Sequence, residues 1–351
     1  MSNKNIYESM KTSSKIRLNG NESSKNINAI KLNEIARDIS DLDLNRYPDT
    51  DSLNLRKAYS KYCCIPYENI IAGNGSDEMI SFVISSYINK GDKVLTLNPD
   101  FSMYDYYVSL NDGELIKLDC RDDGSYDVKD LINLGEKEKI KLIIFSNPNN
   151  PTGYSIENED IKEILEAFKD IPVVIDEAYC EFNESTIINE INNYRNLLVT
   201  RTLSKAFGAA AIRVGFLIGN IEIINKLSKA KVPYNVNSVS QIIGTKVLEN
   251  IDRMKDNLKT TLKERERLIT ELKILTNNNE VKEIKFYKSS GNYIFGRSIY
   301  KDRLLNLLSN NDIEIRSFKD DTFRITIGSF EENNLVLRVI KEFLDERSCY
   351  K

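Results

Sequence analysis

Short apolar segments recur along the first 220 residues of the chain and predict the strands of a sheet. Seven runs are rich in β-branched residues or leucine, at residues 69–73, 93–97, 114–118, 141–145, 172–176, 197–201 and 215–219. Several are apolar throughout, which is typical of strands covered on both faces. Helical patterns or loops separate most of these runs, so the order predicts an α/β fold with a mostly parallel sheet. One such helix is expected directly after "GNGSDE" (73–78), between residues 76 and 89.

The pattern changes in the last third of the chain. Residues 236–277 are charge-rich and helical in spacing, with a hinge expected near the middle. A second small unit follows, with a strand at 293–295, a helix at 299–309, and the strand-like segments "IEIRSF" and "FRITIG". Ser329 and Glu332 form a capping box that predicts the start of the last helix. The buried stripe of that helix is expected to consist of Leu335, Val336, Val339, Ile340 and Phe343.

The length of 351 residues favours one large domain and a smaller one. We expect an N-terminal arm at residues 1–45 that contributes to the small domain, a large domain at 46–245, and a small α+β domain at 246–351. The first fifteen or so residues are expected to be loose.

Composition favours a small-molecule partner. The net charge is only -4, which provides no field for gathering nucleic acid or an anionic membrane. No apolar run approaches the roughly 20 residues of a membrane span, and the first residues lack the apolar centre of a signal peptide. Five cysteines, odd in number and without a CxxC pair, argue against a disulfide framework or a zinc site. We therefore expect a cytoplasmic protein that binds neither nucleic acid nor membrane.

The chain contains no histidine. This excludes the usual Ser-His-Asp and Cys-His mechanisms and removes the commonest transition-metal ligand, so no metal site is expected. If the protein is an enzyme, then lysine, carboxylate, tyrosine or a cofactor must move its protons.

Two loops have the composition of ligand-binding turns. "GNGSDE" joins a strand to a helix, and its glycines and the free N–H groups at the helix start suit an anion such as a phosphate. "SNPNNPTG" (146–153) follows the expected strand at 141–145 and forms a tightly specified loop. In it Asn150, braced by Pro151, can donate to a ligand oxygen. The alternatives are an ordinary strand-to-helix turn and a rigid turn, respectively.

Asp176 of "VVIDEAY" (173–179) ends an apolar strand. Burial makes an unpaired carboxylate costly there, so a cationic or donor partner is expected. It could instead cap a turn, or hold a metal as in a Walker B strand. The metal alternative requires a GxxxxGK[ST] loop, and the chain has none.

Lys205 follows a strand in "RTLSKAFGAAAIRVGF" (201–216), next to the hydroxyls of Thr202 and Ser204. Most lysines are solvated surface groups. A lysine in a dry cleft, however, can lose its proton and form a Schiff base, and Arg213 adds a planar fork suited to an oxyanion.

Together these residues meet the needs of one cofactor, pyridoxal 5'-phosphate. It requires a lysine for its aldehyde, a carboxylate for its pyridinium nitrogen, a donor for its ring oxygen and an anion site for its phosphate. Lys205, Asp176 and Asn150 supply the first three, and "GNGSD" with Ser204 and Arg213 supplies the fourth.

The ordered set "NRYPD", "GNGSDE", "NPDFSMY", "SNPNNPTG", "VVIDEAYCEF", "RTLSKAFGAAAIRVGF" and "FRITIG" resembles the fold type I aminotransferases, most closely the histidinol-phosphate aminotransferase family. The resemblance covers nearly the whole chain, from about Leu18 to the last helix. It implies the fold of a type I pyridoxal-phosphate transferase, in which a large domain carries a mostly parallel seven-stranded sheet flanked by helices.

The resemblance also implies roles for single residues. Lys205, Asp176 and Tyr179 are expected to be catalytic, with Asn150 and Tyr179 as donors to the ring oxygen. Phe101 is expected to stack on the ring, although it could be a plain core residue. The phosphate is expected to be held by Ser76, Asp77, Ser204 and Arg213.

Three further roles concern the substrate and a second subunit. Tyr47 matches a tyrosine that reaches the phosphate from the neighbouring subunit, which implies a homodimer; otherwise it is a turn residue before Pro48. Arg324 matches the arginine that holds the anionic group of the substrate, and the alternative is a charge at a strand edge. Asn21 lies in "NGNESS", a segment that helps to line the substrate entrance but lacks the family's usual proline and aromatic residue, so substrate recognition could differ.

The implied reaction converts histidinol phosphate and 2-oxoglutarate into imidazole-acetol phosphate and glutamate through a Schiff base on Lys205. Lys205 is expected to take the proton from the substrate carbon and to return it. Three alternatives remain open at this point: an aromatic amino-acid aminotransferase, a lyase resembling threonine-phosphate decarboxylase, and a cofactor-binding regulator without turnover.

Overall fold

The computed structural model describes residues 15–26, 29–276 and 283–348. Its larger sheet has seven strands in the order β2-β8-β7-β6-β5-β3-β4. The strands are β2 (Ile70–Gly73), β3 (Lys93–Asn98), β4 (Glu114–Asp119), β5 (Leu142–Ser146), β6 (Val173–Asp176), β7 (Leu197–Thr202) and β8 (Gly215–Gly219). Only β8 runs antiparallel to its neighbours, so the predicted mostly parallel sheet is confirmed, with each strand within one residue of its expected bounds.

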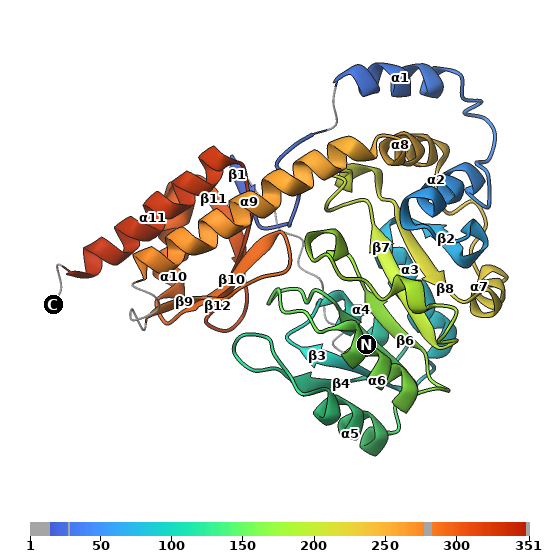
Figure 1. Ribbon diagram of the computed structural model, residues 1–351, viewed down its shortest axis with the longest axis horizontal. Helices are drawn as coiled ribbons and strands as arrows, with labels where there is room; N and C mark the ends of the chain where they lie inside the picture. Colours follow the sequence, from blue (N-terminus) through green and yellow to red (C-terminus); the bar gives the residue numbers. More distant parts are fainter. Residues whose placement is uncertain (1–14, 27–28, 277–282, 349–351) are drawn as a thin grey trace.

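Helices cover both faces of this sheet, which explains why its central strands are buried along their whole length, whereas the edge strand β4 is partly exposed (Figure 1). One face packs against α2 (Leu53–Cys63), α5 (Val128–Glu138) and α6 (Asn158–Ala167). The other packs against α3 (Gly75–Tyr87), α4 (Met103–Leu110) and α7 (Ile221–Ser228). Neighbouring residues of a strand enter opposite cores: Ile143 and Phe145 belong to the first, and Ile144 to the second. The helix expected after "GNGSDE" is α3.

The smaller sheet has five strands in the order β1-β11-β12-β10-β9. They are β1 (Ile16–Leu18), β9 (Ile284–Phe286), β10 (Tyr293–Ser298), β11 (Ile313–Ser317) and β12 (Thr322–Thr326). β1 comes from the N-terminal segment and pairs with β11 in parallel. Three helices, α9 (Ile251–Leu275), α10 (Lys301–Asn310) and α11 (Phe330–Ser348), complete the core of this unit.

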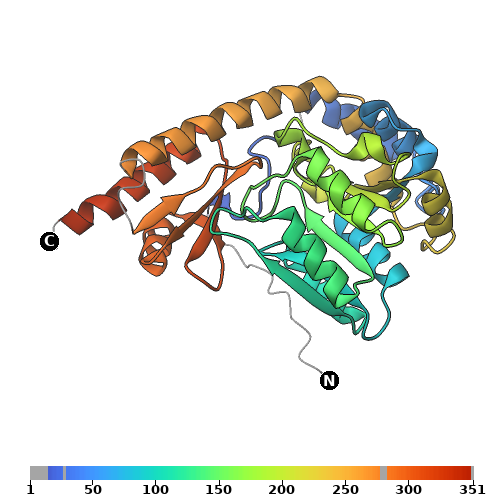
Figure 2. The same ribbon diagram turned by 60° about the horizontal axis from the view of Figure 1, so that its bottom comes forward.

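The expected hinge in the helical segment 236–277 is a break between α8 (Ser238–Leu248) and α9. Figure 2 shows α9 running from the large unit along the back of the small one, beside α11. The capping box at the start of α11 is confirmed, because Ser329 N–H donates to Glu332 Oε2 at 2.7 Å and Glu332 N–H donates to Ser329 Oγ at 3.2 Å. Its stripe is buried at Val336, Val339, Ile340 and Phe343, and half-buried at Leu335.

Other elements had no clear signal in the sequence. These are β1, β9, α1 (Ala29–Ser40) and the short 3₁₀ turns η1 (Tyr67–Asn69), η2 (Cys180–Phe182), η3 (Ile188–Glu190) and η4 (Ala210–Ile212). The expectation of a loose N-terminus concerns residues 1–14, which lie outside the described residues. Within the described ranges, the helices are all too short or too polar to cross a membrane.

Candidate active site

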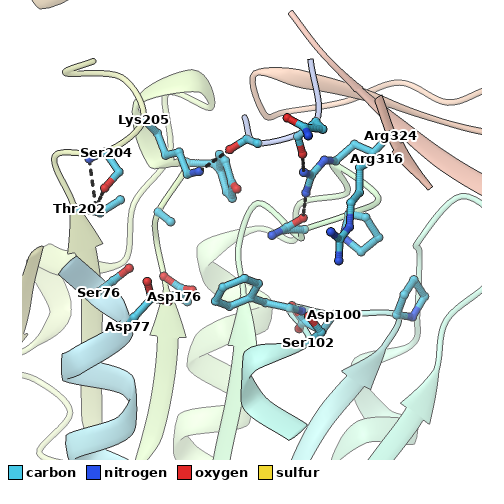
Figure 3. A pocket seen from close by; sticks show the side chains of 18 of the residues that line it. Ser76, Asp77, Asp100, Ser102, Asp176, Thr202, Ser204, Lys205, Arg316 and Arg324 are labelled. Atoms are coloured by element: carbon cyan, nitrogen blue, oxygen red, sulfur yellow. Dashed lines mark hydrogen bonds between the residues drawn. The ribbon is translucent and has the colours of Figure 1, made fainter. Parts of the chain in front are cut away.

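A cavity of about 340 Å³ lies where the carboxyl ends of the large sheet's strands face the small sheet. Loops at strand ends of an α/β sheet are where such proteins bind ligands. The structure brings most of the predicted site residues together in its wall: Ser76, Asp77, Phe101, Asn150, Asp176, Tyr179, Ser204, Lys205, Arg213 and Arg324. Figure 3 shows the residues of α3 at one end of the cavity, the small-domain arginines at the other, and Lys205 between them.

Two predicted residues lie elsewhere. Asn21 is fully buried behind the cavity wall, where its Nδ2 donates to the Tyr179 hydroxyl at 2.9 Å. Asn21 therefore contacts Tyr179, which lines the cavity, and not the cavity itself. Tyr47 is 81% exposed and stacks on Tyr234 with ring centroids 4.7 Å apart, outside the cavity. No atom of Tyr47 therefore takes part in this cavity from within the same chain.

The start of α3 forms an anion cradle at one end of the cavity. The Asn74 side chain makes no capping hydrogen bond to the helix, and the N–H groups of a helix's first turn favour an anion. Gly75 has φ +78°, and a Cβ there would lie 2.6 Å from Arg213 Nη2. The absence of a side chain at Gly75 thus leaves room for the guanidinium beside the helix start.

Ser204 and Arg213 complete this cradle. Arg213 forms an ion pair with Asp77 at 2.9 Å, and its Nη1 donates to Ser204 Oγ at 3.3 Å. Ser204 Oγ also accepts from Thr202 Oγ1 at 2.9 Å. A hydroxyl that accepts two hydrogen bonds still has its own hydrogen to donate, so Ser204 can present it to an anion.

Lys205 points into the cavity rather than into solvent. It is half-buried, its Nζ donates to Gly20 O at 2.9 Å, and the same atom lies 5.7 Å from the centre of the Tyr179 ring. The lysine is therefore held near the aromatic wall by one backbone carbonyl, a bond that a ligand can replace.

Asp176 lies deep in the cavity and is held by two hydroxyl groups. Tyr104 Oη donates to Oδ2 at 3.0 Å and Thr200 Oγ1 donates to Oδ1 at 2.9 Å. Burial raises the pKa of Asp176 to about 6, and the hydroxyl donors from Thr200 and Tyr104 oppose that rise. A cationic group bound in the cavity would complete the pairing that the burial of Asp176 requires.

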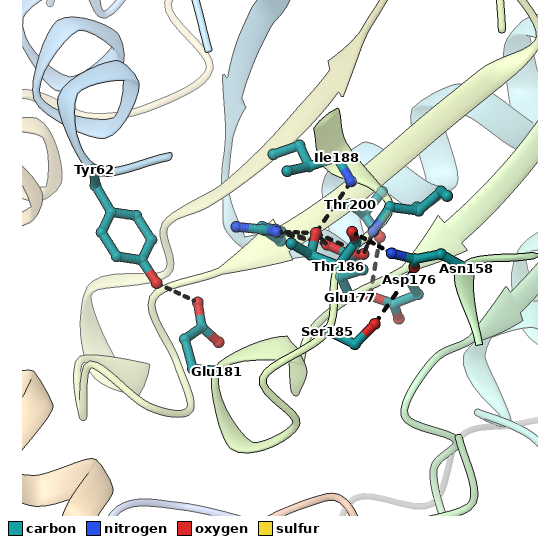
Figure 4. A network of polar contacts seen from close by, with 11 residues as sticks. Tyr62, Asn158, Asp176, Glu177, Glu181, Ser185, Thr186, Ile188 and Thr200 are labelled. Atoms are coloured by element: carbon teal, nitrogen blue, oxygen red, sulfur yellow. Dashed lines mark hydrogen bonds and ion pairs between the residues drawn. The ribbon is translucent and has the colours of Figure 1, made fainter. Parts of the chain in front are cut away.

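The strand ends behind Asp176 are tied by a buried ion pair. Arg201 donates through Nε and Nη2 to Glu177 Oε2, at 2.9 and 2.7 Å, and Thr186 Oγ1 also donates to this carboxylate. Figure 4 shows Glu177 and Thr186 meeting beside Thr200 and Asp176. Because both charges are buried and fully paired, the network holds β6 and β7 in register below the cavity.

Asn150 and Tyr179 present donors to the same space. Asn150 Oδ1 accepts from Arg324 Nη1, which leaves the two hydrogens of Nδ2 for a ligand. The Tyr179 hydroxyl accepts from Asn21 Nδ2, so its own hydrogen is available for donation.

The far end of the cavity is cationic. Arg324 donates through Nη2 to Asn19 O at 2.7 Å and lies opposite Arg316 in the pairing of β12 with β11. Arg316 also lines the cavity, with its guanidinium 5.9 Å from the centre of the Phe318 ring. No carboxylate within the described part of the chain forms an ion pair with Arg316.

Sequence reasoning missed Arg316, Tyr104 and Thr200. For Arg316 the sequence offered no signal, because Arg316 alternates with Ile313 and Ile315 and so lies on the opposite strand face, where a charged residue is ordinary. Tyr104 and Thr200 read as ordinary helix and strand residues, and only the folded chain brings their hydroxyls to Asp176.

The arrangement fits a flat ring that carries an aldehyde, a basic nitrogen and a phosphate. Arg213 and Ser204 beside the start of α3 offer donors to an anion at one edge, and Asp176 offers a buried carboxylate whose pairing is completed by a cation. Phe101 in the wall provides an aromatic face, and Lys205 supplies an amine.

Comparisons with known proteins agree with this geometry. A family model described as aminotransferase class I and II matches residues 13–340. A histidinol-phosphate aminotransferase of Clostridium kluyveri is 40% identical over 342 residues, which cover 96% of this chain and 95% of that protein. The crystal structure of the histidinol-phosphate aminotransferase from Clostridium acetobutylicum is 26% identical with a TM-score of 0.83, covering 94% of this chain and 99% of that one.

A more distant structure shares the fold. The histidinol-phosphate aminotransferase from Sinorhizobium meliloti, solved in complex with pyridoxal-5'-phosphate, has a TM-score of 0.84 at 20% identity, covering 95% of this chain and 91% of that one. The overall fold is therefore shared by this chain and solved aminotransferases.

Proposed function

The chain belongs to the class I and II aminotransferases, and on this basis we propose that it binds pyridoxal 5'-phosphate and transfers an amino group from histidinol phosphate to 2-oxoglutarate. The products are imidazole-acetol phosphate and glutamate. When bound, the cofactor supplies an aldehyde that carries the amino group and a ring that accepts negative charge from the substrate carbon. The observation that carries the proposal is the position of Lys205 between an anion cradle and a pair of arginines.

The cradle at α3 holds the cofactor phosphate. The backbone of Ser76 and Asp77, the Ser204 hydroxyl and the Arg213 guanidinium supply its donors. Asp77 is itself an anion, and its ion pair with Arg213 fixes the orientation of that guanidinium.

The ring is oriented by groups on three sides. Asp176 holds a proton on the ring nitrogen through its carboxylate, which Tyr104 and Thr200 keep in place. Asn150 Nδ2 and the Tyr179 hydroxyl donate to the ring oxygen. Phe101 stacks on one face of the ring.

Lys205 Nζ carries out the proton transfers. Its amine would hold the cofactor through the aldehyde of that group. Once a substrate amine took that place, Lys205 Nζ would be free to take the proton from the amine-bearing carbon of the substrate and to return it to the carbon of the former aldehyde. One residue serves both transfers, which accounts for catalysis in a chain that has no histidine.

Arg324 and Arg316 hold the anionic end of the substrate. A phosphate monoester carries about -1.5 to -2 charges at neutral pH, whereas a carboxylate carries one. Two guanidinium groups on neighbouring strands therefore match the phosphate of histidinol phosphate better than the single carboxylate of an aromatic amino acid. The two carboxylates of 2-oxoglutarate can use the same pair in the second half of the reaction.

The active enzyme is proposed to be a homodimer in which Tyr47 reaches the partner's active site. Large apolar side chains are exposed near Tyr47, including Leu44 at 82% and Val232 at 67%. Leu44, Tyr47 and Tyr234 also line a second hollow of about 480 Å³. Clustered exposed apolar residues of this kind mark an interface, and a second copy of the chain would cover them.

The described cysteines, Cys63, Cys64, Cys120 and Cys180, are all free thiols, which supports the proposed cytoplasmic location.

The proposal is tested with purified protein reconstituted with pyridoxal phosphate. Histidinol phosphate should change the absorbance of the lysine-bound cofactor to that of its amine form, and 2-oxoglutarate should restore it with release of glutamate. Lys205→Ala should bind the cofactor without that cycle. Carbon dioxide release without a keto acid would instead identify a lyase. A response to aromatic amino acids alone would identify an aromatic aminotransferase, and no response to any amine would identify a regulator.

A further inference from the structure

A third carboxylate, Asp100, lines the cavity beside Asp77 and Asp176 and has no part in the reaction proposed above (Figure 3). Asp100 follows β3, which is next to β5 in the sheet. Its Oδ1 accepts from Phe101 N–H at 2.8 Å and from the Ser146 hydroxyl, and its Oδ2 accepts from Ser146 N–H at 3.2 Å. The carboxylate thus ties the end of β3 to the last residue of β5.

Ser146 passes this contact on to Asn150. A hydroxyl has one hydrogen, and that of Ser146 is directed to Asp100, so its oxygen faces outward as an acceptor. Asn150 N–H donates to this oxygen at 2.9 Å. The chain of donors therefore runs in one direction, from Asn150 to Ser146 to Asp100.

The side chain of Asn150 is fixed at its other end by Arg324, which donates to Oδ1. The position of Nδ2 then depends on two anchors, the backbone bond to Ser146 and the side-chain bond to Arg324. We propose that Asp100 is a positioning residue that orients Ser146 and thereby places Asn150 Nδ2 against the ring oxygen. This inference rests on the proposed function, because the ring oxygen is the partner assigned to Asn150 there.

The burial of Asp100 supports a functional reason for its presence. The pKa of Asp100 is raised to about 8, mainly by burial and in smaller part by the neighbouring Asp176, while the donors from Ser146 and Phe101 oppose the rise. A carboxylate in such surroundings costs stability, and groups of this kind are concentrated at functional sites. A serine or threonine would accept from Phe101 N–H at lower cost, so that one hydrogen bond does not by itself account for an aspartate.

The variant Ser146→Ala separates the two roles, because it removes the link to Asn150 and leaves the bond between Asp100 and Phe101 N–H. The readout is the pH midpoint of the absorbance change of the lysine-bound cofactor. A donor to the ring oxygen stabilises its anionic form and lowers this midpoint. A misplaced Asn150 should therefore raise the midpoint, by about 0.5 to 1 pH unit in Ser146→Ala and in Asp100→Asn.

The double variant should show the same rise as either single variant, since both changes break one chain of bonds. Ser146→Thr retains a hydroxyl and should keep the wild-type midpoint. Asp105→Asn removes a carboxylate of α4 that pairs with Lys117, and this variant should also keep the wild-type midpoint. The proposal is overturned if Asn150→Ala raises the midpoint while Ser146→Ala and Asp100→Asn leave it unchanged in proteins that melt like the wild type.

A second measurement does not require the cofactor. Hydrogen exchange of the segment 146–153 in cofactor-free protein should be faster in Ser146→Ala and Asp100→Asn than in the wild type and in Asp105→Asn. Equal exchange in all four proteins would also overturn the inference. A wild-type protein that shows no Lys205-dependent absorbance would contradict the proposed function instead, and the exchange comparison would still decide the link between Asp100 and Asn150.

Discussion

The Tyr104 hydroxyl donates to Asp176 Oδ2 at 3.0 Å, so an uncharged group on α4 helps to hold the carboxylate at the floor of the cavity. Tyr104→Phe removes this donor and keeps the ring that packs against Phe101. The ionised form of Asp176 becomes less favourable and its orientation less fixed, so kcat should fall about ten-fold. The KM for the amino donor should change little. Tyr106→Phe, the same change on a half-buried residue of the same helix, should leave steady-state rates unaltered.

Asp176 also predicts how stability depends on pH in the cofactor-free protein. Burial raises its pKa to about 6, from an ordinary value of about 4. An acid whose pKa is raised by folding stabilises the protein fully below the ordinary value, and this stability is lost as the pH rises through the folded-state value. Asp176→Asn removes the loss, so at pH 8 it should be more stable than the wild type by about 2 to 3 kcal/mol.

Denaturant unfolding of both cofactor-free proteins between pH 4 and pH 8 checks this sign. The two curves should converge near pH 4, separate between about pH 4 and pH 6, and keep a constant gap at higher pH. With pyridoxal phosphate present the order should reverse, because the ring nitrogen pairs with the ionised carboxylate only in the wild type. A cofactor-free Asp176→Asn protein that is less stable than the wild type across the whole range would contradict the assignment of a costly buried charge.

Gly75 should be essential for the phosphate cradle, and Gly91 provides a matched control. Both glycines have positive φ, +78° and +83°, so alanine strains the backbone at either position. A Cβ at Gly75 meets Arg213 Nη2 at 2.6 Å, whereas one at Gly91 has nothing within 4 Å. Gly75→Ala should weaken pyridoxal phosphate binding at least about ten-fold, and Gly91→Ala should leave it within a factor of about two. Fluorescence titration measures both, and equal affinities would show that Arg213 is not confined by Gly75.

Most strands of the large sheet could be predicted from the sequence because burial on both faces makes them short apolar runs; the edge strand β4 has polar residues but keeps three apolar ones. Loop residues at their carboxyl ends were predictable for a related reason: in a parallel sheet these ends meet at one edge, so Asn150, Asp176 and Lys205 had to lie near one another. The position of each of these residues at or soon after the end of a predicted strand therefore indicated that they lie together in the fold.

Other features depend on partners that are distant in sequence. β1 has three residues, too few for a period, and exists because β11 offers it an edge. Asn21 was expected at the substrate entrance, but its position behind Tyr179 follows from bonds to Thr326 and Tyr179 that no local pattern encodes. Arg316 was overlooked for the same reason, since its role depends on Arg324 across the strand pair.

Arg316 should determine the preference for a phosphorylated substrate. Arg316→Ala removes one of two guanidinium groups at the end of the cavity, and the second negative charge of a phosphate then has no partner. The ratio kcat/KM for histidinol phosphate should fall about 10- to 100-fold, and that for an unphosphorylated aromatic amine less than about three-fold. Lys319→Ala removes an exposed positive charge from the turn that follows β11 and should alter neither ratio. Equal losses for both substrates in Arg316→Ala would place Arg316 outside substrate selection.

The contribution of Tyr47 across a dimer can be tested with hybrids of two inactive variants. Tyr47→Ala damages the site of the partner, whereas Lys205→Ala damages the site of its own subunit. A hybrid of the two variants therefore contains one site that lacks both groups and one site that has both. Random reassociation of equal amounts makes half of the dimers hybrids, so about a quarter of the wild-type sites should be restored.

The activity of the mixture is measured before and after mild dissociation and reassociation, with each variant alone as a control. Recovery requires that Tyr47 of one subunit reach the active site of the other. In the isolated chain the exposed ring of Tyr47 stacks on Tyr234. If Tyr47 acted within its own chain, each hybrid subunit would lack one of the two groups at its own site, and the mixture would stay as inactive as its components. A dimeric mixture without recovered activity would therefore assign Tyr47 to packing against Tyr234 and not to the partner's cofactor.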